Sequence, residues 1–482
     1  MNVKYLFFLL LLTLIISCSK EIETEIITET EITPILNITI EGEGTVTESY
    51  EHETVVKLTS VPSEGWEFVA WSGDLTGDEN PVNVTLTDSI NITAKFMRYF
   101  NYNIPSHEWK NNIQPWLDLN KATSDNGLFE EPFEGPSTTG TAYADFNYDG
   151  YIDIMTPVSI QDGMDHDFYF LINDGNDNFI LDNSIVFEKT VEAIGARKTI
   201  VGDFNGDNKP DVVRCAGGHD IVKKPNITLS TEGGFVFNEI SNAPISQFHT
   251  VSSGDIDNDG DLDLFFAQSG GLDGFAINDG SANFTWKPII EIIDNFTIDG
   301  IQGFYGIWTS EMYDVNKDGN IDLVVAGEYK DTDDDESFLD GPTIFWGNGT
   351  GLFDYNTSTS IYVSRDLDIS NDNRIEVTND IVFNDVEGDG FVEFVSSSVL
   401  ESGHTYIQIF KGLEDYSFEN KTQDWLTDNL LIEGTTWIFL RDVDNNGFID
   451  IVESETFVSR NDGSYGPSIR WEWNGSSFTK IN

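Results

Sequence analysis

Short runs of alternating apolar and polar residues occur along most of this 482-residue chain, separated by glycine, asparagine and proline. The segment NITIEGEGTVT at 37–47 alternates in this way, and shorter apolar runs are IDIMTP at 152–157, IDLVVAG at 321–327 and IDIVES at 449–454. Alternation with a period of two over four to eight residues is typical of β-strands. The 34 Phe, 16 Tyr and 11 Trp residues add to the strand-favouring content. The pattern therefore predicts an all-β protein.

The first residues form a different pattern. Residues 1–17, MNVKYLFFLLLLTLIIS, place one lysine before an apolar run, as in a signal peptide. The sequence Ile15-Ile16-Ser17-Cys18 resembles the bacterial lipoprotein box, which implies cleavage before Cys18 and lipidation of its thiol. The next residues, SKE, resemble the surface-export signal of Bacteroidetes lipoproteins. Residues 18–34 are rich in Glu, Ile and Thr and predict an acidic tether.

Residues 35–98 predict a small all-β domain of four or five strands, because several alternating segments are split by Gly and Pro. The segments NITIEGEGTVT, GWEFVAWSGD and SINITAKF resemble the divergent internalin-type B-repeat domain. That resemblance implies a spacer or adhesive module of a bacterial surface protein.

One acidic motif recurs six times in residues 99–482. Its copies are DFNYDGYID, DFNGDNKPD, DIDNDGDLD, DVNKDGNID, DVEGDGFVE and DVDNNGFID, and they begin at residues 145, 203, 255, 314, 385 and 442. The intervals are 58, 52, 59, 71 and 57 residues, and an apolar run follows each copy. Such a period is the signature of a repeat architecture. A unit of this length with four short strands predicts a propeller blade.

The repeats resemble the FG-GAP/VCBS family, the integrin-α-like β-propellers. The resemblance implies a six- or seven-bladed β-propeller over 99–482, preceded by the small all-β domain. Six motifs are present, and residues 99–144 leave a degenerate seventh blade open. The segment NGLFEE within that stretch looks like the last strand of a blade, so closure of the sheet between the two ends is expected.

Each motif predicts a calcium loop, because oxygen-bearing residues at positions one, three, five and nine of a tight turn converge on one point. Position six is glycine in five copies and Asn208 in the second, where we expect a positive φ. Position seven would offer its backbone carbonyl. The candidate ligands, for up to six structural Ca²⁺ ions, are Asp145, Asn147, Asp149, Tyr151 and Asp153; Asp203, Asn205, Asp207, Lys209 and Asp211; Asp255, Asp257, Asp259, Asp261 and Asp263; Asp314, Asn316, Asp318, Asn320 and Asp322; Asp385, Glu387, Asp389, Phe391 and Glu393; and Asp442, Asp444, Asn446, Phe448 and Asp450.

The motif differs from an EF-hand, and two of its six copies depart from the common pattern. An EF-hand needs glutamate at position twelve and flanking helices, whereas only the sixth copy has that glutamate and β runs follow the loops. The fifth loop, with Glu387 and Glu393, and the sixth, with Asn446, depart from the pattern. An acidic turn without metal is the alternative, but so many carboxylates in one loop repel one another without a counter-ion.

The repeat register also predicts a binding site. Residues six positions before each loop should form a ring at the mouth of the central channel, on the face opposite the calcium loops. This ring includes Arg197, His249, Trp308 and Asn379, with Trp437 beside it. Such side chains suit recognition of a sugar or an acidic group, although ordinary strand-start residues would show similar variety.

The net charge of the chain narrows the range of possible binding partners. With 84 acidic and 25 basic residues the net charge is −59, which excludes nucleic acid as a phosphate-bound partner. No nucleophile elbow, HExxH or phosphate loop is present. We therefore expect a non-enzymatic protein that is lipid-anchored at the outer-membrane surface and binds a glycan or a protein. The alternatives are a propeller-fold polysaccharide lyase, with His249 and Tyr305 as its candidates, and a scaffold in a surface nutrient-uptake complex.

Overall fold

The computed structural model describes residues 34–52, 54–113, 141–157, 168–175, 179–182, 196–216, 224–231, 234–268, 272–295, 304, 306–328, 341–361, 375–426, 431–433, 438–442, 446–453 and 470–481. The chain divides into two compact units, Met1–Phe96 and Met97–Asn482. Within the described ranges, no helix has the length and apolar character needed to cross a bilayer. Cys18, on which the lipidation prediction rests, lies outside these ranges.

The first unit contains six strands, one or two more than the sequence predicts. They are β1 (Leu36–Glu41), β2 (Gly44–His52), β3 (Val55–Pro62), β4 (Trp66–Gly73), β5 (Val82–Thr85) and β6 (Ile90–Arg98). They form two three-stranded sheets, β1-β6-β4 and β2-β3-β5, and β1 runs parallel to β6. Alternate residues of β3 and β6 point into a core that includes Trp71 and Phe96.

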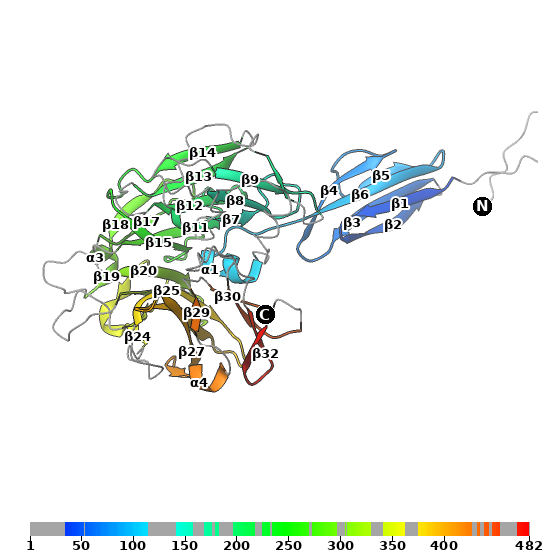
Figure 1. Ribbon diagram of the computed structural model, residues 1–482. Helices are drawn as coiled ribbons and strands as arrows, with labels where there is room; N and C mark the ends of the chain where they lie inside the picture. The colour runs from blue at the N-terminus through cyan, green and yellow to red at the C-terminus, as the bar shows by residue number, and fades with distance from the viewer. Residues whose placement is uncertain are drawn as a thin grey trace, which may run out of the picture. The chain divides into compact units, whose positions relative to one another are not determined.

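In its described part the second unit contains six antiparallel blade sheets, five of four strands and one of five strands. They are drawn in Figure 1. The first three consist of β7 (Ala142–Ala144), β8 (Asp153–Pro157), β9 (Phe168–Asn173) and β10 (Phe179–Leu181); β11 (Ala196–Gly202), β12 (Asp211–Ala216), β13 (Asn226–Thr231) and β14 (Gly234–Glu239); and β15 (Phe248–Gly254), β16 (Asp263–Gln268), β17 (Gly274–Ile277) and β18 (Thr285–Pro288).

The other three sheets follow the same order along the chain. They consist of β20 (Ile307–Tyr313), β21 (Asp322–Gly327), β22 (Thr343–Phe345) and β24 (Thr359–Ser360); β25 (Ile375–Asn384), β26 (Glu393–Leu400), β27 (His404–Gly412) and β28 (Phe418–Asn420), with β29 (Leu431–Glu433) added to β27; and β30 (Ile438–Arg441), β31 (Asp450–Glu453), β32 (Arg470–Trp473) and β33 (Phe478–Ile481). These sheets are the blades of an all-β propeller, as the sequence predicts.

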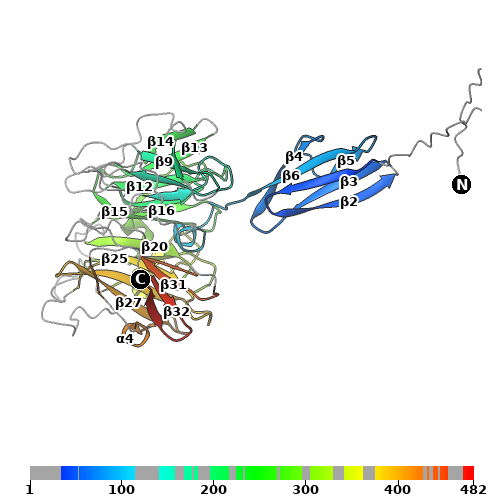
Figure 2. The same ribbon diagram turned by 45° about the vertical axis from the view of Figure 1, so that its right-hand side comes forward.

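The first strand of each blade is the innermost one. Neighbouring first strands contact each other in chain order from β7 to β30, and the blades follow one another in that order in Figure 2. All residues of β15 and β16 are buried, because blades pack against both faces of a central sheet. Phe265 and Phe275 of the third blade thus share one core with Leu323 and Phe345 of the fourth.

Residues 99–113 precede the first blade and supply no strand to it. They contain α1 (Ser106–Glu108) and the π-helix η1 (Trp109–Ile113). The first blade takes all its described strands from 142–181, and the sixth takes its strands from 438–481. The described part of the chain therefore holds six blades and shows no strand exchange between its ends. NGLFEE, at 126–131, lies outside the described residues. The remaining short elements are α3 (Ile289–Ile292), β19 (Ile293–Asp294), β23 (Phe353–Asp354), η4 (Tyr355–Thr357) and α4 (Thr422–Trp425).

Candidate functional site

The six acidic loops join the first and second strands of their blades. In each blade, position one follows the innermost strand, and position nine is the first residue of the second strand. All six loops therefore lie at the same end of the innermost strands. In the third loop this geometry brings together the carboxylates of positions one, three and nine.

Backbone amides organise the carboxylates of every loop in the same way. The position-one aspartate accepts hydrogen bonds from the N–H groups of positions five and six, at 2.7–3.2 Å, in all six loops. The position-five side chain accepts the N–H of position seven at 2.8–3.1 Å. These hydrogen bonds orient the side-chain oxygens of positions one and five toward the centre of each loop. The ligand role of the position-seven carbonyls stays a prediction.

The loops need left-handed backbone at two positions. Position six has φ between 57° and 98° in all six loops, including Asn208 in the second. Position four is also left-handed in each of the first five loops, at Tyr148, Gly206, Asn258, Lys317 and Gly388. The sequence pattern reveals position six through its glycines, whereas side chains as different as Tyr148 and Lys317 conceal position four.

Position nine anchors each loop to the sheet. In the first loop Asp153 accepts the N–H of Phe146 at 3.0 Å and that of Asn173, on the third strand, at 2.8 Å. The equivalent Asp211, Asp263 and Asp322 make the same two contacts. Burial, with neighbouring loop carboxylates, raises the pKa of Asp153 to about 7 and that of Asp211 to about 8. These loops thus bury negative charge that a cation would neutralise.

The third loop has the donor set that best fits a cation. Oxygens of Asp255, Asp257 and Asp263 lie within 4.8 Å of one another. Asp257 Oδ1 is buried and has no hydrogen-bond partner. Burial and the nearby Asp259 and Asp255 raise the pKa of Asp257. An unpartnered carboxylate oxygen facing other carboxylates is what a hard cation such as Ca²⁺ requires.

The fifth and sixth loops differ from this arrangement. In the fifth, Glu387 and Asp389 both contact the ammonium group of Lys411. In the sixth, Asp444 lies outside the described residues, while Asn446 and Asp442 keep the common hydrogen bonds.

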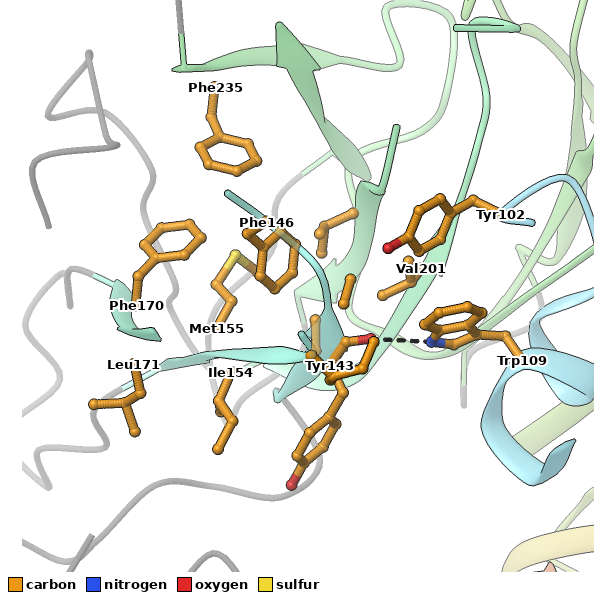
Figure 3. Packing of buried hydrophobic residues seen from close by; sticks show 14 of the residues in the cluster. Tyr102, Trp109, Tyr143, Phe146, Ile154, Met155, Phe170, Leu171, Val201 and Phe235 are labelled. Carbon is orange, nitrogen blue, oxygen red and sulfur yellow. Dashed lines mark hydrogen bonds between the residues drawn. The ribbon is translucent and has the colours of Figure 1, made fainter. Parts of the chain in front are cut away.

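The helical segment 106–113 packs against the innermost strands β11, β15, β20 and β30, and α1 lies beside them in Figure 1. Ser106 and Ser253 of β15 exchange hydrogen bonds through their backbone N–H and hydroxyl groups. Trp109 Nε1 donates to the carbonyl of Tyr143 on β7, at 3.1 Å (Figure 3). Asn111 Oδ1 accepts the N–H of Leu440 on β30. The segment therefore links the innermost strands of the first and last blades.

A buried ion-pair network fixes the same segment. Glu311 of β20 is 1% exposed, and its carboxylate lies 2.8 Å from Lys198 Nζ, 3.5 Å from His107 Nδ1 and 4.0 Å from Lys110 Nζ. Lys110 also pairs with Asp380 of β25 at 3.0 Å. These five residues escaped the sequence analysis. A charged residue inside the strand sequence IWTSEMY was the available signal.

The structure brings part of the predicted ring together. His249 and Trp308 lie on adjacent blades with ring centroids 4.8 Å apart and planes at 75°. Trp308 Nε1 donates to Glu328 Oε1 at 3.0 Å, and Asn379 is buried. The side chain of Arg197, together with all of Trp437 and Tyr305, lies outside what the structure describes. The ring assignment therefore stays a prediction that rests on His249, Trp308 and Asn379.

Two solved structures match part of the chain at low similarity. One is CoXyl43, a GH43 β-xylosidase/α-arabinofuranosidase from a compost microbial metagenome, in complex with xylotriose and in a calcium-free form. It is 12% identical, with a TM-score of 0.32, and the match covers 71% of this chain and 93% of that one. The other is a thermostable family-43 glycoside hydrolase, 11% identical, with a TM-score of 0.32 and coverage of 73% and 96%.

Both of these structures are enzymes, so they contradict the expectation that the protein is not an enzyme, and we drop it. At this similarity they assign no reaction to the chain. No curated protein matches it. Family models match two stretches: a divergent InlB B-repeat domain spans residues 35–99, and an FG-GAP-like repeat spans residues 255–325, which includes the third and fourth acidic loops.

Proposed function

We propose that this protein is a calcium-stabilised propeller that binds a glycan at the channel end opposite its acidic loops. One observation carries the proposal. The segment 106–113 contacts the innermost strands near their acidic-loop ends, whereas His249 and Trp308 lie near the opposite ends of β15 and β20. A ligand that uses the channel would therefore enter beside this pair.

The chemistry of the pair suits a sugar. Trp308 is partly buried and its indole nitrogen is held by Glu328, so the ring has a fixed orientation. Fixed aromatic faces with a few convergent polar groups are typical of small-molecule sites. His249 and Asn379 would supply the polar groups. Since the ring comes from successive blades, it would surround one or a few sugar units.

Calcium would be held by the first four loops, through positions one, three, five and nine. Bound there, it would neutralise the carboxylates that burial and mutual repulsion hold in an unfavourable state. The fit is strongest in the third loop, where Asp257 offers an unpartnered oxygen. Because the loops lie away from the proposed glycan site, the role of the metal would be structural.

A glycan array probed with and without Ca²⁺ tests the binding proposal. Wild type should bind one glycan class, and Trp308→Ala should lose that binding. Trp346→Ala is the matched control, since this partly buried indole also donates a hydrogen bond, to Thr359, but directly follows the third strand β22. Absence of glycan binding in both conditions, or equal loss in both variants, would overturn the proposal. Bound polysaccharides should then be incubated with the protein and analysed for shortened chains.

We also propose that a lipid on Cys18 anchors the protein at the outer-membrane surface. The support is the lipoprotein-like sequence Ile15-Ile16-Ser17-Cys18. Labelling expressing cells with an alkyne fatty acid should tag the protein, and Cys18→Ser should abolish the tag. External protease should degrade the anchored protein on intact cells. A tag that persists in the Cys18 variant would refute lipidation at this residue.

A further inference from the structure

The third strand of each blade places one residue beside its acidic loop, and strand register identifies the equivalents. The residue that pairs with the one after position nine is Leu171, Thr228, Ala276, Phe345, Phe410 or Trp471 in the six blades. The next residue is therefore Ile172, Leu229, Ile277, Trp346, Lys411 or Glu472. Only the fifth blade carries a cation at this place.

The ammonium group of Lys411 lies inside the ligand set of its own loop. It contacts Glu387, at position three, and lies 3.0 Å from Asp389 Oδ2, at position five. Its Nζ is also 5.9 Å from the centroid of Trp425, so an aromatic face covers it. A lysine held by two carboxylates and an aromatic ring occupies a defined position, with about a quarter of its side chain exposed.

A second lysine reaches the same loop from the neighbouring blade. Lys317, at position four of the fourth loop, lies 3.5 Å from Asp385 Oδ2, at position one of the fifth. The corresponding position in the first three loops is Tyr148, Gly206 or Asn258, none of which is charged. Two ammonium groups thus supply the fifth loop with the positive charge that one divalent ion would supply elsewhere.

Two candidate ligand positions of the fifth loop also carry residues that differ from those in the first four loops. Position three is Glu387 and position nine is Glu393, where the first four loops have Asp or Asn at position three and Asp at position nine. The longer Glu387 side chain reaches outward to Lys411. The hydrogen bonds from Asp389 and Gly390 to Asp385 are kept, so the turn forms with its usual backbone geometry.

We propose that Lys411, assisted by Lys317, replaces calcium in the fifth loop, so that this turn folds without metal. A calcium ion at the same place would meet a positive charge already bound to two of its ligands, and like charges at this range repel. The inference rests on the proposal that the first four loops bind calcium.

Matched substitutions at position five separate the two proposals. Asp318→Asn in the fourth loop should lower the number of calcium ions bound per chain by one, and Asp389→Asn in the fifth should leave it at the wild-type value. Calcium is counted by elemental analysis of gel-filtered, calcium-saturated protein. Asp149→Asn in the first loop is a second reference if the Asp318 variant does not fold.

The outcomes are distinct. Loss of one ion in Asp389→Asn would overturn the lysine proposal while supporting calcium binding. A wild-type protein without bound calcium would instead refute calcium binding itself. As a second measurement, Lys411→Met should lower the melting temperature in saturating Ca²⁺. Lys421→Met should change it little, because the partners of Lys421, Glu419 and Asp424, are exposed. Equal melting of the two lysine variants would also overturn the proposal.

Discussion

Substitution of Glu311 by glutamine tests whether the buried ion-pair network holds the helical segment in the channel. The change keeps the size of the side chain and removes its charge. Lys198, His107 and Lys110 then lose their shared carboxylate. Lys198 keeps the carbonyl of Ser310 at 2.6 Å, and Lys110 keeps Asp380. The variant is therefore expected to fold, but with a weaker link between the segment and the blades.

The expected loss follows from the pKa of Glu311. Burial alone would raise this pKa, but Lys198, His107 and Lys110 outweigh burial and lower it from 4.5 to about 2. The pKa difference of about 2.5, at about 1.4 kcal/mol per pKa unit, corresponds to about 3.5 kcal/mol. Removal of one partner of a buried ion pair costs about 3–5 kcal/mol. The two lysine side chains are 16–18% exposed, so we expect the lower end of this range.

Thermal unfolding in saturating Ca²⁺ measures the loss. For a unit of this size, about 3 kcal/mol lowers the melting temperature by about 3–5 °C. Glu291→Gln is the control, because Glu291 forms an exposed pair with Lys287 at 3.6 Å and should change little. Because the folded-state pKa is lowered, the stabilisation is complete above pH 4.5 and is lost as the pH falls toward 2. The difference from wild type should thus be constant between pH 6 and 8. A Glu311 variant that melts within 1 °C of wild type at pH 7 would show that the network contributes nothing.

Three further results are expected. Chelation should lower the melting temperature by about 5–10 °C, and Ca²⁺ but not Mg²⁺ should restore it, since Mg²⁺ demands near-ideal octahedral geometry whereas Ca²⁺ accepts flexible geometry; an unchanged melt would rule out structural calcium. Gly319 has φ 88° and open space around it, so Gly319→Ala should lower the free energy of unfolding in urea by about 1–2 kcal/mol through backbone strain alone. Asn208→Gly should leave this free energy nearly unchanged. Equal effects of the two substitutions would contradict the argument from backbone conformation. Asp273→Asn should cost about 2–3 kcal/mol, because both buried oxygens accept backbone N–H groups and an amide nitrogen cannot; the exposed Asp279→Asn is its control, and similar melting of the two would contradict this account.

The sequence predicted the features that are repeated and local. Each acidic loop encodes its own turn, so the glycine at position six signals a positive φ, and even Asn208 has the expected backbone. The apolar run after each loop predicts the second strand, since its residues pack on both faces. Because the acidic motif occurs six times, the order of the blades along the chain could be predicted. These predictions depend only on residues within a few positions of one another.

Features that depend on distant contacts could not be predicted. His107 meets Phe383 across 276 positions, and Asn111 meets Leu440 across 329. Neither belongs to a repeat, so no periodicity marks them. Lys411 is an intermediate case: it became informative only when strand register aligned it with Ile172 and its equivalents. The expected NGLFEE closing strand remains untested, while η1 already joins the first and last blades.

This link explains how stability is distributed in the second unit. Each blade buries its faces against its neighbours. The first and last blades are joined through the segment 106–113. Trp109 contacts the innermost strand of the first blade, and Asn111 that of the last. Glu311, from the fourth blade, holds the same segment through buried ion pairs. The segment 106–113 therefore belongs energetically to the propeller that follows it. Since it packs near the acidic-loop ends of the strands, these ion pairs and the hydrogen bonds within the loops stabilise the same end of the fold.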